Sequence, residues 1–163
     1  MTDYRSLLSA LVVGRVEFIL VGGVAAAAHG SARLTQDLDV VYSRKPANIR
    51  RLVESLAPLS PYLRGAPAGL PFRWDVETVR RGLNFTLTTS LGSLDALGEI
   101  AGQGSYETLI RKTIPLAVFG MTVRCLSLEA LIAAKRAAGR PQDLEAVAEL
   151  EAIREERARQ SRS

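Results

Sequence analysis

The sequence predicts a mixed α/β fold of the α+β class, in which a central mixed β-sheet is flanked by α-helices. Runs of β-branched and aromatic residues, which favour strands, lie in the middle of the chain, for example VEFILVG and DLDVVYS. Segments with helical spacing of apolar residues lie towards the two ends, as in YRSLLSALVV. This order favours one domain, which we expect to span residues 1–163 with a frayed tail at 157–163.

The first half of the chain alternates helices and strands. Leu7, Leu8 and Leu11 have helical spacing. A later alanine-rich run is too poor in β-branched residues for a strand, and Pro46 can begin a helix whose apolar face includes Ile49. The elements predicted here, in order, are a helix at 4–13, a strand at 16–22, a short helix at 24–29, a strand at 37–43 and a helix at 46–56.

The second half begins with a loop at 58–71, because this segment holds four prolines and two glycines. Near the end of the chain, Ser127 can cap a helix that Gly139 stops, and Pro141 opens a last helix. The elements predicted between these points, in order, are strands at 72–79, 82–90 and 91–100, a loop with a helical turn at 102–112, strands at 113–119 and 121–126, and a helix at 127–138.

Composition limits the class of protein. No apolar run approaches the ~20 residues of a membrane span, and the N-terminus lacks the basic-then-apolar order of a signal peptide. The lone cysteine, Cys125, lies in an apolar run, so we expect it to be a core residue in a protein of the reducing cytoplasm. The net charge of +4 comes mostly from arginine, which suits phosphate contacts but does not establish nucleic-acid binding.

Asp37 and Asp39 lie two residues apart on a predicted strand. Side chains alternate faces along a strand, so both carboxylates share one face while Leu38 takes the other. Two carboxylates this close repel each other where the dielectric constant is low, so a cation has to neutralise them. Arg33 and Arg44 are near enough in sequence to form salt bridges. A divalent metal ion is the alternative, since Mg²⁺ prefers one or two carboxylates plus substrate phosphates.

Gly22 and Gly23 end the preceding strand and open a helix. Glycines let phosphate oxygens approach the backbone closely, and a helix N-terminus favours anions; a tight strand-to-helix turn is the alternative interpretation. The sequence contains neither a Walker loop nor a dinucleotide fingerprint after its first strand. A phosphate cradle at one strand end, beside a carboxylate pair on the next strand, indicates a site for a nucleoside triphosphate (NTP) and Mg²⁺.

Further polar residues fit this pattern. Asp95 lies on a predicted strand, where it could hold the same ions or accept a proton, or simply face solvent. Lys135 shares the apolar stripe of its predicted helix, so it either extends to solvent or reaches the triphosphate. Arg140 pairs with Asp143 or binds a phosphate. We expect His29, at the end of the alanine-rich helix, to bond carbonyl groups of that helix rather than to act as a base.

The run LVGGVAAAAHGSARLTQDLDVV resembles the polymerase-β-type nucleotidyltransferase superfamily, whose pattern is a glycine pair, a helix and D-x-D. More narrowly, the chain is similar to the small bacterial branch that includes the AbiEii-type toxins of abortive-infection and toxin–antitoxin systems. That branch carries HG-x-x-R-x-T-x-D-x-D, which is fairly specific, and later K…R-P-x-D-L…L, which is weak alone. The residues that match these motifs are His29, Gly30, Arg33, Thr35, Asp37, Asp39, Lys135, Arg140, Pro141, Asp143, Leu144 and Leu150.

This resemblance, which covers most of residues 17–153, implies a nucleotidyltransferase-like sheet with two Mg²⁺ ions, for which Mn²⁺ can substitute. It implies transfer of a nucleoside monophosphate (NMP) from an NTP to a hydroxyl group, with release of pyrophosphate. Asp37 and Asp39 would bind both ions, and Asp95 would complete the site on the nucleophile side. The residues that would contact the nucleotide are Gly22, Gly23, Arg33, Lys135 and Arg140.

The chain departs from the family pattern in two ways. Larger relatives carry a long extra helical region, so we expect acceptor binding here to differ or to need a partner. Many relatives carry a second acid where this chain has Ala146, so a full catalytic role is not assigned to Asp143.

The expected partners are an NTP and an acceptor that the sequence leaves open among RNA or tRNA, a protein and a small molecule. A cognate antitoxin or toxin is expected as well, a homodimer is open, and no membrane is involved. One alternative is a catalytically silent interaction module, such as an antitoxin-like partner, although all three acids are present. Another is a plain RNA-binding domain, although the clustered aromatic residues of an RNA-stacking sheet are missing.

Overall fold

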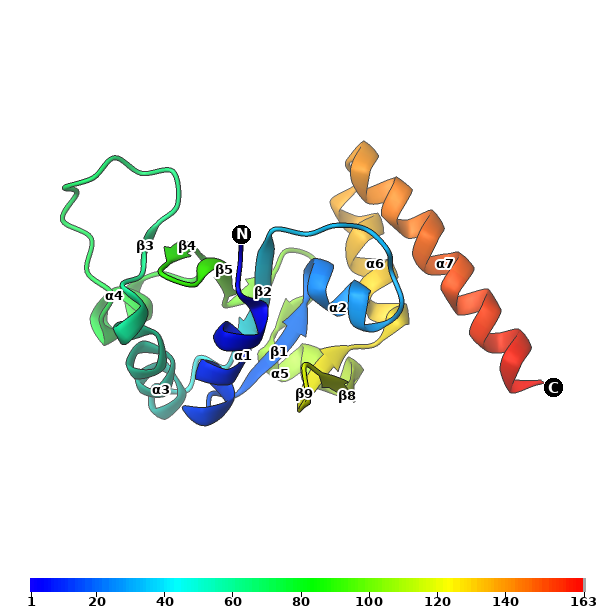
Figure 1. The fold of residues 1–163 in the computed structure, drawn as a ribbon, viewed down its shortest axis with the longest axis horizontal. Helices are drawn as coiled ribbons and strands as arrows, with labels where there is room; N and C mark the ends of the chain where they lie inside the picture. Colours follow the sequence, from blue (N-terminus) through cyan, green and yellow to red (C-terminus); the bar gives the residue numbers. More distant parts are fainter. Residues whose placement is uncertain (163) are drawn as a thin grey trace.

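The computed structural model describes residues 1–162 and contains a seven-stranded mixed sheet surrounded by helices (Figure 1). In spatial order the strands are β3 (Tyr62–Leu63), β4 (Phe85–Thr89), β5 (Gly92–Leu97), β2 (Asp37–Tyr42), β1 (Phe18–Val21), β9 (Met121–Leu126) and β8 (Thr113–Val118). A second sheet pairs β6 (Glu99–Ile100) with β7 (Gly104–Ser105). The predicted fold class, a central mixed sheet flanked by helices, is confirmed.

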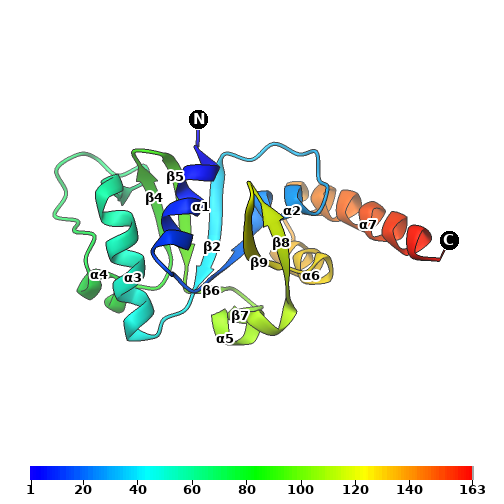
Figure 2. The ribbon, with the colours of Figure 1, turned by 60° about the horizontal axis from the view of Figure 1, so that its bottom comes forward.

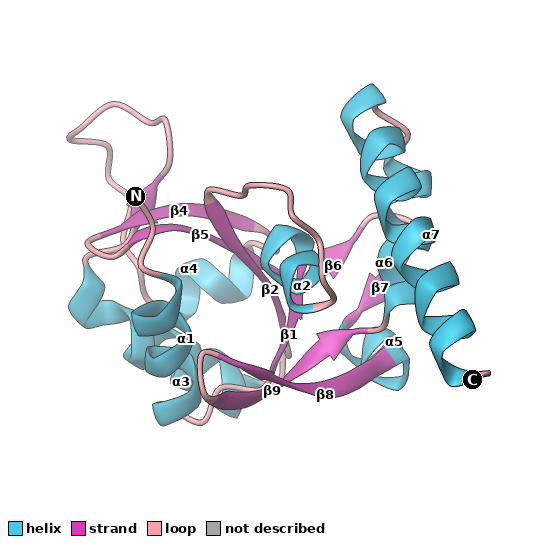
Figure 3. Ribbon diagram, turned by 45° about the vertical axis from the view of Figure 1, so that its right-hand side comes forward, coloured by secondary structure: helices cyan, strands magenta, loops and turns pink. Residues whose placement is uncertain are grey.

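The helices gather at two sides of the sheet. They are α1 (Tyr4–Val13), α2 (Gly22–Ala28), α3 (Pro46–Leu56), α4 (Val76–Arg81), α5 (Tyr106–Leu109), α6 (Leu128–Ala138) and α7 (Pro141–Ser161), with 3-10 turns η1 (Ala57–Leu59) and η2 (Ile110–Lys112). Figures 2 and 3 show α3 and α4 together on one side of the molecule and α6 and α7 together on the other. Within residues 1–162, no helix combines the length and the apolarity needed to cross a bilayer.

The centre of the sheet is formed by β1 and β2, which run antiparallel with Val21 opposite Asp39. Strand β2 is parallel to β5, and β1 is parallel to β9. A parallel pair requires a crossover connection, and the chain between β2 and β5 supplies it with α3, β3, α4 and β4. Two segments far apart in sequence are thereby joined side by side, which aligns Asp39 with Asp95.

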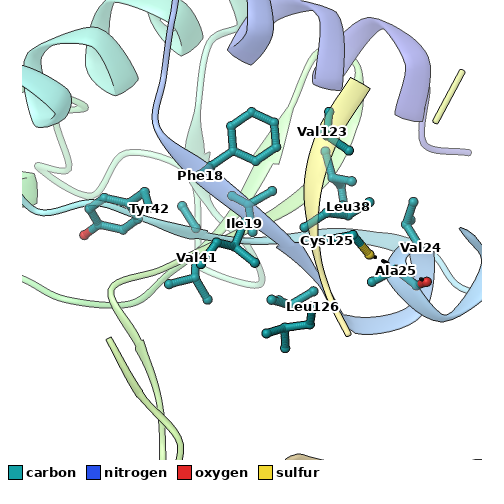
Figure 4. Close-up of a cluster of buried hydrophobic side chains, with 14 of the residues drawn as sticks. Phe18, Ile19, Val24, Ala25, Leu38, Val41, Tyr42, Val123, Cys125 and Leu126 are labelled. Carbon is teal, nitrogen blue, oxygen red and sulfur yellow. Dashed lines mark hydrogen bonds between the residues drawn. The ribbon is translucent and has the colours of Figure 1, made fainter. Parts of the chain in front are cut away.

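The main core lies against these central strands. All four residues of β1 are buried; Ile19 lies opposite Val41 of β2, and Cys125 of β9 belongs to the same buried cluster (Figure 4). The Cys125 thiol lies 4.0 Å from the carbonyl oxygen of Ala25, and burial raises the pKa of this thiol to about 12. The prediction of a core cysteine is therefore confirmed. Burying a large aliphatic side chain such as Ile19 fully in this core contributes roughly 1.5–3 kcal/mol to the free energy of folding.

The capping signals of α6 act as predicted. The Ser127 hydroxyl accepts a hydrogen bond from the backbone N–H of Ala130 at 3.2 Å. Gly139 ends the helix with a φ of 69°, in the left-handed region that glycine adopts without steric cost. Pro141 begins α7 only two residues after Gly139, so α6 and α7 meet at a sharp corner.

The strand predicted at 72–79 is wrong. Residues 72–75 form neither helix nor strand, and α4 begins at Val76. The Asp75 carboxylate accepts a hydrogen bond from the backbone N–H of Thr78 at 2.8 Å and so caps the helix. Glu77 in the first turn and Arg80 in the last complement the helix dipole, which outweighs the β-propensity of the segment.

Two further boundaries need correction. The loop predicted at 58–71 contains η1 and the short edge strand β3, which pairs with β4. The frayed tail predicted at 157–163 is wrong for residues 157–161, which continue α7 to Ser161; Ser163 lies outside the described residues. Arg157 fixes this part of the helix, because its Nη2 donates a hydrogen bond to the carbonyl oxygen of His29 at 2.8 Å.

Candidate active site

Three aspartates meet on adjacent strands. Asp37 and Asp39 begin β2, and Asp95 lies in the middle of the parallel strand β5. In the register of this pair Asp39 is directly opposite Asp95, and Asp37 is opposite Ser93. Directly opposed residues of neighbouring strands point to the same face of a sheet, so the three carboxylates form one acidic cluster. The alternation predicted the shared face of Asp37 and Asp39, and the parallel pairing of β2 with β5 adds Asp95 to that face.

The start of α2 lies against the acidic cluster. Gly22 has a φ of 69°, and a Cβ built on it would lie 2.0 Å from Asp39 Oδ2. A Cβ on Gly23 would lie 2.6 Å from the Thr35 side chain. Both glycines are therefore required by close approach, and the backbone at the end of β1 touches the acid of β2.

Mutual repulsion and burial govern the charge of Asp39. The pKa of Asp39 is raised to about 8, first by burial and then by the neighbouring Asp95 and Asp37 carboxylates. The Lys135 ammonium group acts in the opposite direction. The cluster thus favours any additional positive charge placed between its acids.

Arg64 supplies part of that charge. Its Nη2 lies 2.8 Å from Asp95 Oδ1, and its Nη1 lies 3.7 Å from Asp37 Oδ1. The same Nη2 donates a hydrogen bond to the carbonyl oxygen of Leu87 at 2.8 Å. Local sequence patterns do not reveal this residue, because Arg64 lies in the proline-rich segment and reaches the acids only through the pairing of β3 with β4.

The two arginines proposed from the sequence as salt-bridge partners of the acids lie elsewhere. Arg33 Nη2 is 3.8 Å from Glu145 Oε2. Arg44 donates hydrogen bonds to the Tyr42 hydroxyl at 2.7 Å and to the carbonyl oxygen of Val79 at 3.1 Å. The prediction failed for Arg44 because β2 carries it to the opposite end of the strand from Asp37.

The corner between α6 and α7 carries the other predicted cations. Asp143 is only 1% exposed and accepts hydrogen bonds from Arg140 Nε at 2.7 Å and from the Arg140 backbone N–H at 3.2 Å. Lys135 Nζ lies 3.5 Å from Asp143 Oδ1. The hydrogen bond from the Arg140 side chain is the main cause that lowers the pKa of Asp143. Asp143 therefore holds both cations at the edge of the acidic cluster.

Two cavities flank Asp39 and Lys135, which line both of them. The first, of about 190 Å³, also has Gly23, Arg33 and Thr35 in its wall. The second cavity measures about 250 Å³ and combines polar groups with an apolar wall. The residues of the second cavity are Val21, Gly22, Asp39, Asp95, Leu97, Ile100, Leu126, Leu131, Ala134, Lys135, Ala138, Arg140 and Asp143. Every predicted site residue except Asp37 thus lines one of these cavities.

His29 differs from the expectation that it bonds its own helix. Its Nε2 lies 2.8 Å from the carbonyl oxygen of Leu126, and its Nδ1 lies 3.0 Å from Arg157 Nη1. These partners fit a neutral ring that donates from Nε2 and accepts at Nδ1. Burial is the largest cause that lowers the pKa of His29, and the Arg157 charge adds to it. His29 therefore ties α2 to β9 and α7.

The acids offer the oxygen ligands that Mg²⁺ prefers, although they are not arranged as a ready ligand set. Among residues 1–162, no three His, Cys, Asp or Glu side chains converge closely enough to hold a metal ion. Asp95 Oδ1 is nevertheless a buried oxygen with no hydrogen-bond donor among the described residues, since its contact with Arg64 lacks hydrogen-bond geometry. The donor chemistry fits a hard divalent cation, to which Asp95 offers a buried carboxylate oxygen that is ion-paired with Arg64 Nη2 at 2.8 Å.

Comparison with known proteins gives one matching family and several solved structures that share the fold. The family described as nucleotidyl transferase AbiEii toxin, type IV toxin–antitoxin system, matches residues 6–144. No curated protein sequence matches the chain at a significant level.

Solved structures share the fold at low sequence identity. The lincosamide antibiotic adenylyltransferase LnuA, bound to lincomycin, has 15% identity and a TM-score of 0.61, covering 93% of this chain and 98% of its own. ANT(2")-Ia with adenylyl-2"-tobramycin has 17% identity and a TM-score of 0.57, covering 94% of each chain. A Thermotoga maritima protein described as a nucleotidyltransferase has 15% identity and a TM-score of 0.56, covering 91% and 94%.

Proposed function

Because this chain belongs to the AbiEii family of nucleotidyl transferases, we propose that it is a Mg²⁺-dependent enzyme that transfers an NMP from an NTP to a hydroxyl acceptor. In this reaction an acceptor oxygen forms a bond to the α-phosphorus, the bond to the bridging oxygen breaks, and pyrophosphate leaves. The observation that carries the proposal is the alignment of Asp39 with Asp95 on β2 and β5, with Asp37 on the same face and Gly22 in contact with Asp39.

The three acids would hold the metal ions. Asp37 and Asp39 would hold the Mg²⁺ ions, and Asp95 would contribute a further carboxylate oxygen on the acceptor side. When bound, the ions supply positive charge for the reacting phosphate and for the attacking and leaving oxygens. Asp95 itself lines the second cavity, where it can orient the acceptor hydroxyl and take its proton.

The two cavities divide the substrates between them. The first cavity has the Gly23 backbone, Arg33 and Lys135 in its wall, which suits a triphosphate. The second cavity has Asp95 at its edge and an apolar wall that includes Leu97 and Leu131, which suits the acceptor. Lys135 lines both cavities and would face the phosphate between them.

The comparisons support a proposal for the donor and for the biological role. Two proteins with this fold are described as an adenylyltransferase and as bound to an adenylyl product, which supports ATP as the donor. The family description supports a role as the toxin of a toxin–antitoxin pair, with a cognate antitoxin as partner. The cytoplasm is the proposed location, in keeping with the lone, buried cysteine. The acceptor classes to test are RNA or tRNA, a protein hydroxyl and a small molecule, since the two relatives are described with lincomycin and with adenylyl-tobramycin.

The first test is calorimetric titration of each of the four NTPs, with and without Mg²⁺. Wild-type protein is compared with the Asp37→Asn/Asp39→Asn double variant, which removes two charges at nearly constant volume. We expect binding of one NTP that requires Mg²⁺ and is lost in the variant. The labelled NTP is then incubated with tRNA, total protein and small-molecule fractions, so that the labelled fraction names the acceptor. Failure of every NTP to bind would overturn the proposal in favour of a silent interaction module.

A further inference from the structure

Arg64 occupies the space in which the acidic cluster needs positive charge. We infer that Arg64 is an internal cation that competes with metal ions: it neutralises Asp37 and Asp95 in the metal-free enzyme and leaves them when Mg²⁺ or Mn²⁺ binds. The inference rests on the proposed function, because it takes these acids as metal ligands. It assigns the residue as a positioning group that sets how readily the site takes up metal.

The contacts of Arg64 fall on the oxygens that a metal ion would use. Nη2 lies 2.8 Å from Asp95 Oδ1, the buried oxygen that lacks a hydrogen-bond donor, and Nη1 lies 3.7 Å from Asp37 Oδ1. A Mg²⁺ ion binds carboxylate oxygens at about 2.1 Å, so an ion on Asp95 Oδ1 would come within a few ångströms of the guanidinium. Positive charges at that separation repel each other strongly in a partly buried site. The guanidinium and an ion on Asp95 therefore exclude each other.

The guanidinium is held by charge more than by a complete hydrogen-bond network. Arginine has five N–H donors, yet Arg64 Nε is buried and has no acceptor among the described residues. The hydrogen bond from Nη2 to the carbonyl oxygen of Leu87, at 2.8 Å, is shared with the contact to Asp95. A side chain whose donors are only partly used gives up few hydrogen bonds when it moves away, so the ion pairs with the acids are its main attachment.

The surroundings of Arg64 give it a route out of the cluster. It follows the two-residue strand β3, and its backbone N–H donates to the carbonyl oxygen of Thr86 at 3.0 Å. About 30% of its side chain is already exposed. Gly65 and Gly69 follow, and a Cβ on either would meet no atom within 4 Å, so the neighbouring space is open. The backbone anchor can therefore stay in place while the side chain turns towards solvent.

An alternative role predicts the opposite result. If Arg64 stayed beside Asp95 in the loaded enzyme and oriented that carboxylate towards the metal, its loss would weaken metal binding. If Arg64 competes with the metal, its loss strengthens metal binding. The sign of the change in Mn²⁺ affinity therefore separates the two roles, and a merely structural role would leave it unchanged.

The experiment is direct titration of Mn²⁺ into the full chain, with free Mn²⁺ measured by electron paramagnetic resonance. The proteins are the wild type, Arg64→Met, Arg64→Gln and a matched control, Arg73→Met, which removes an exposed arginine from the same segment. We expect the Kd for Mn²⁺ to fall about tenfold in both Arg64 variants and to stay unchanged in the control. The Gln variant keeps a donor for Leu87, so it covers the case in which the Met variant does not fold.

Melting temperatures measured on the same proteins give a second readout. Without metal we expect the Arg64 variants to melt below the wild type, because the acids lose their counter-charge; with saturating Mn²⁺ we expect a larger rise than in the wild type. An unchanged or higher Kd in folded Arg64 variants would overturn the inference and leave the proposed function intact. Absence of Mn²⁺ binding in all four proteins would overturn the proposed function, and this inference with it.

Discussion

Two aspartates in different regions of the molecule, Asp39 in the sheet and Asp143 at the start of α7, have pKa values that shift in opposite directions, although burial by itself raises both. Asp143 is almost fully enclosed, yet its pKa is lowered, mainly because the Arg140 side chain donates a hydrogen bond to it. Asp39 is only half-buried, yet its pKa is raised to about 8, first by burial and then by Asp95 and Asp37. The difference teaches that the neighbours of a buried carboxylate, more than its depth, decide whether its charge is stabilised.

The same difference separates an acid whose charge is balanced by nearby cations from one whose charge is not. Lys135 and Arg140 both form ion pairs with Asp143, so the negative charge of this acid is balanced by its neighbours. The cluster around Asp39 has three acids and, within hydrogen-bond range of them, mainly Arg64 to offset them. Sites that violate local electrostatic consistency are usually those that bind a ligand, and here the missing charge is cationic.

The largest effect is expected from Asp39→Asn, which removes the carboxylate that Asp95 and Asp37 repel. NMP transfer should fall by roughly 10³-fold, the scale seen when one group that stabilises a transition state is removed. The free energy of unfolding of the metal-free protein should stay the same or rise at pH 8, since repulsion from Asp95 is relieved. Turnover of labelled NTP and urea unfolding measure the two quantities. A large loss of stability together with activity would mean that Asp39 is structural, like Asp143.

The next largest effect is expected from Asp143→Asn, the same substitution at the acid that Arg140 and Lys135 balance. It should lower the free energy of unfolding by about 1–3 kcal/mol, because donors of Arg140 lose their charged acceptor in a buried place. Urea unfolding measures it. The matched control is Glu145→Gln on the same helix, whose exposed side chain lies 3.8 Å from Arg33 and should matter by less than about 0.5 kcal/mol. Equal effects of the two variants would contradict the assignment of Asp143 as a structural acid.

The pH dependence of stability should distinguish the two acids. Unfolded chains release the Asp39 proton near the ordinary pKa of 3.8, whereas the folded chain keeps it until about 8. The folded state therefore binds more protons between these values, and rising pH should lower stability across this window by at most about 1.4 kcal/mol per pH unit. Denaturant titrations in EDTA should show this slope in the wild type and a flatter one in Asp39→Asn.

Asp143 should behave in the opposite sense. Its pKa is lowered in the folded state, so its contribution is complete above the ordinary value of 3.8 and is lost only as the pH falls further. Asp143→Asn should therefore leave the slope between pH 4 and pH 8 unchanged. A change of slope in that window would show that the two regions are coupled.

The smallest effect on stability is expected from His29→Gln, which replaces a buried, neutral ring whose two nitrogens both have hydrogen-bond partners. The lowered pKa of His29 means that the unfolded state binds more protons near pH 6, so stability should fall as the pH drops below about 6.5. The variant should lose this acid sensitivity while changing stability near pH 8 by about 1 kcal/mol or less. Thermal melts from pH 5 to pH 8 measure it, and an unchanged profile would contradict the role given to the ring.

Much of the candidate site follows from local sequence rules. Strand alternation places Asp37 and Asp39 on one face, and the glycines after β1 mark a close approach to a neighbour. That Asp95 stands opposite Asp39 depends on a parallel pairing across more than fifty residues of sequence, and only the strand itself was predictable.

The parts that sequence patterns missed depend on short or long-range features. Arg64 reaches the acids because a strand of two residues pairs at the sheet edge, and no hydrophobic period is visible over two residues. The alternation of Phe72, Trp74 and Val76 favours a strand, but in the structure Asp75 caps helix α4 at this point. The end of α7 is polar, and its order depends on the bond from Arg157 to His29, which lies 128 residues away.

The close contact at Gly22 has a consequence for how this site can vary during evolution. The gap between Gly22 and Asp39 admits a hydrogen atom and nothing larger, since a Cβ would lie 2.0 Å from the carboxylate. Every missense change of this codon adds at least a methyl group, so selection for activity should retain glycine there. At Gly102, whose φ is also positive, no atom lies within 4 Å of the added carbon, and the cost is backbone strain alone. Two glycines with similar backbone angles should thus carry unequal mutational loads.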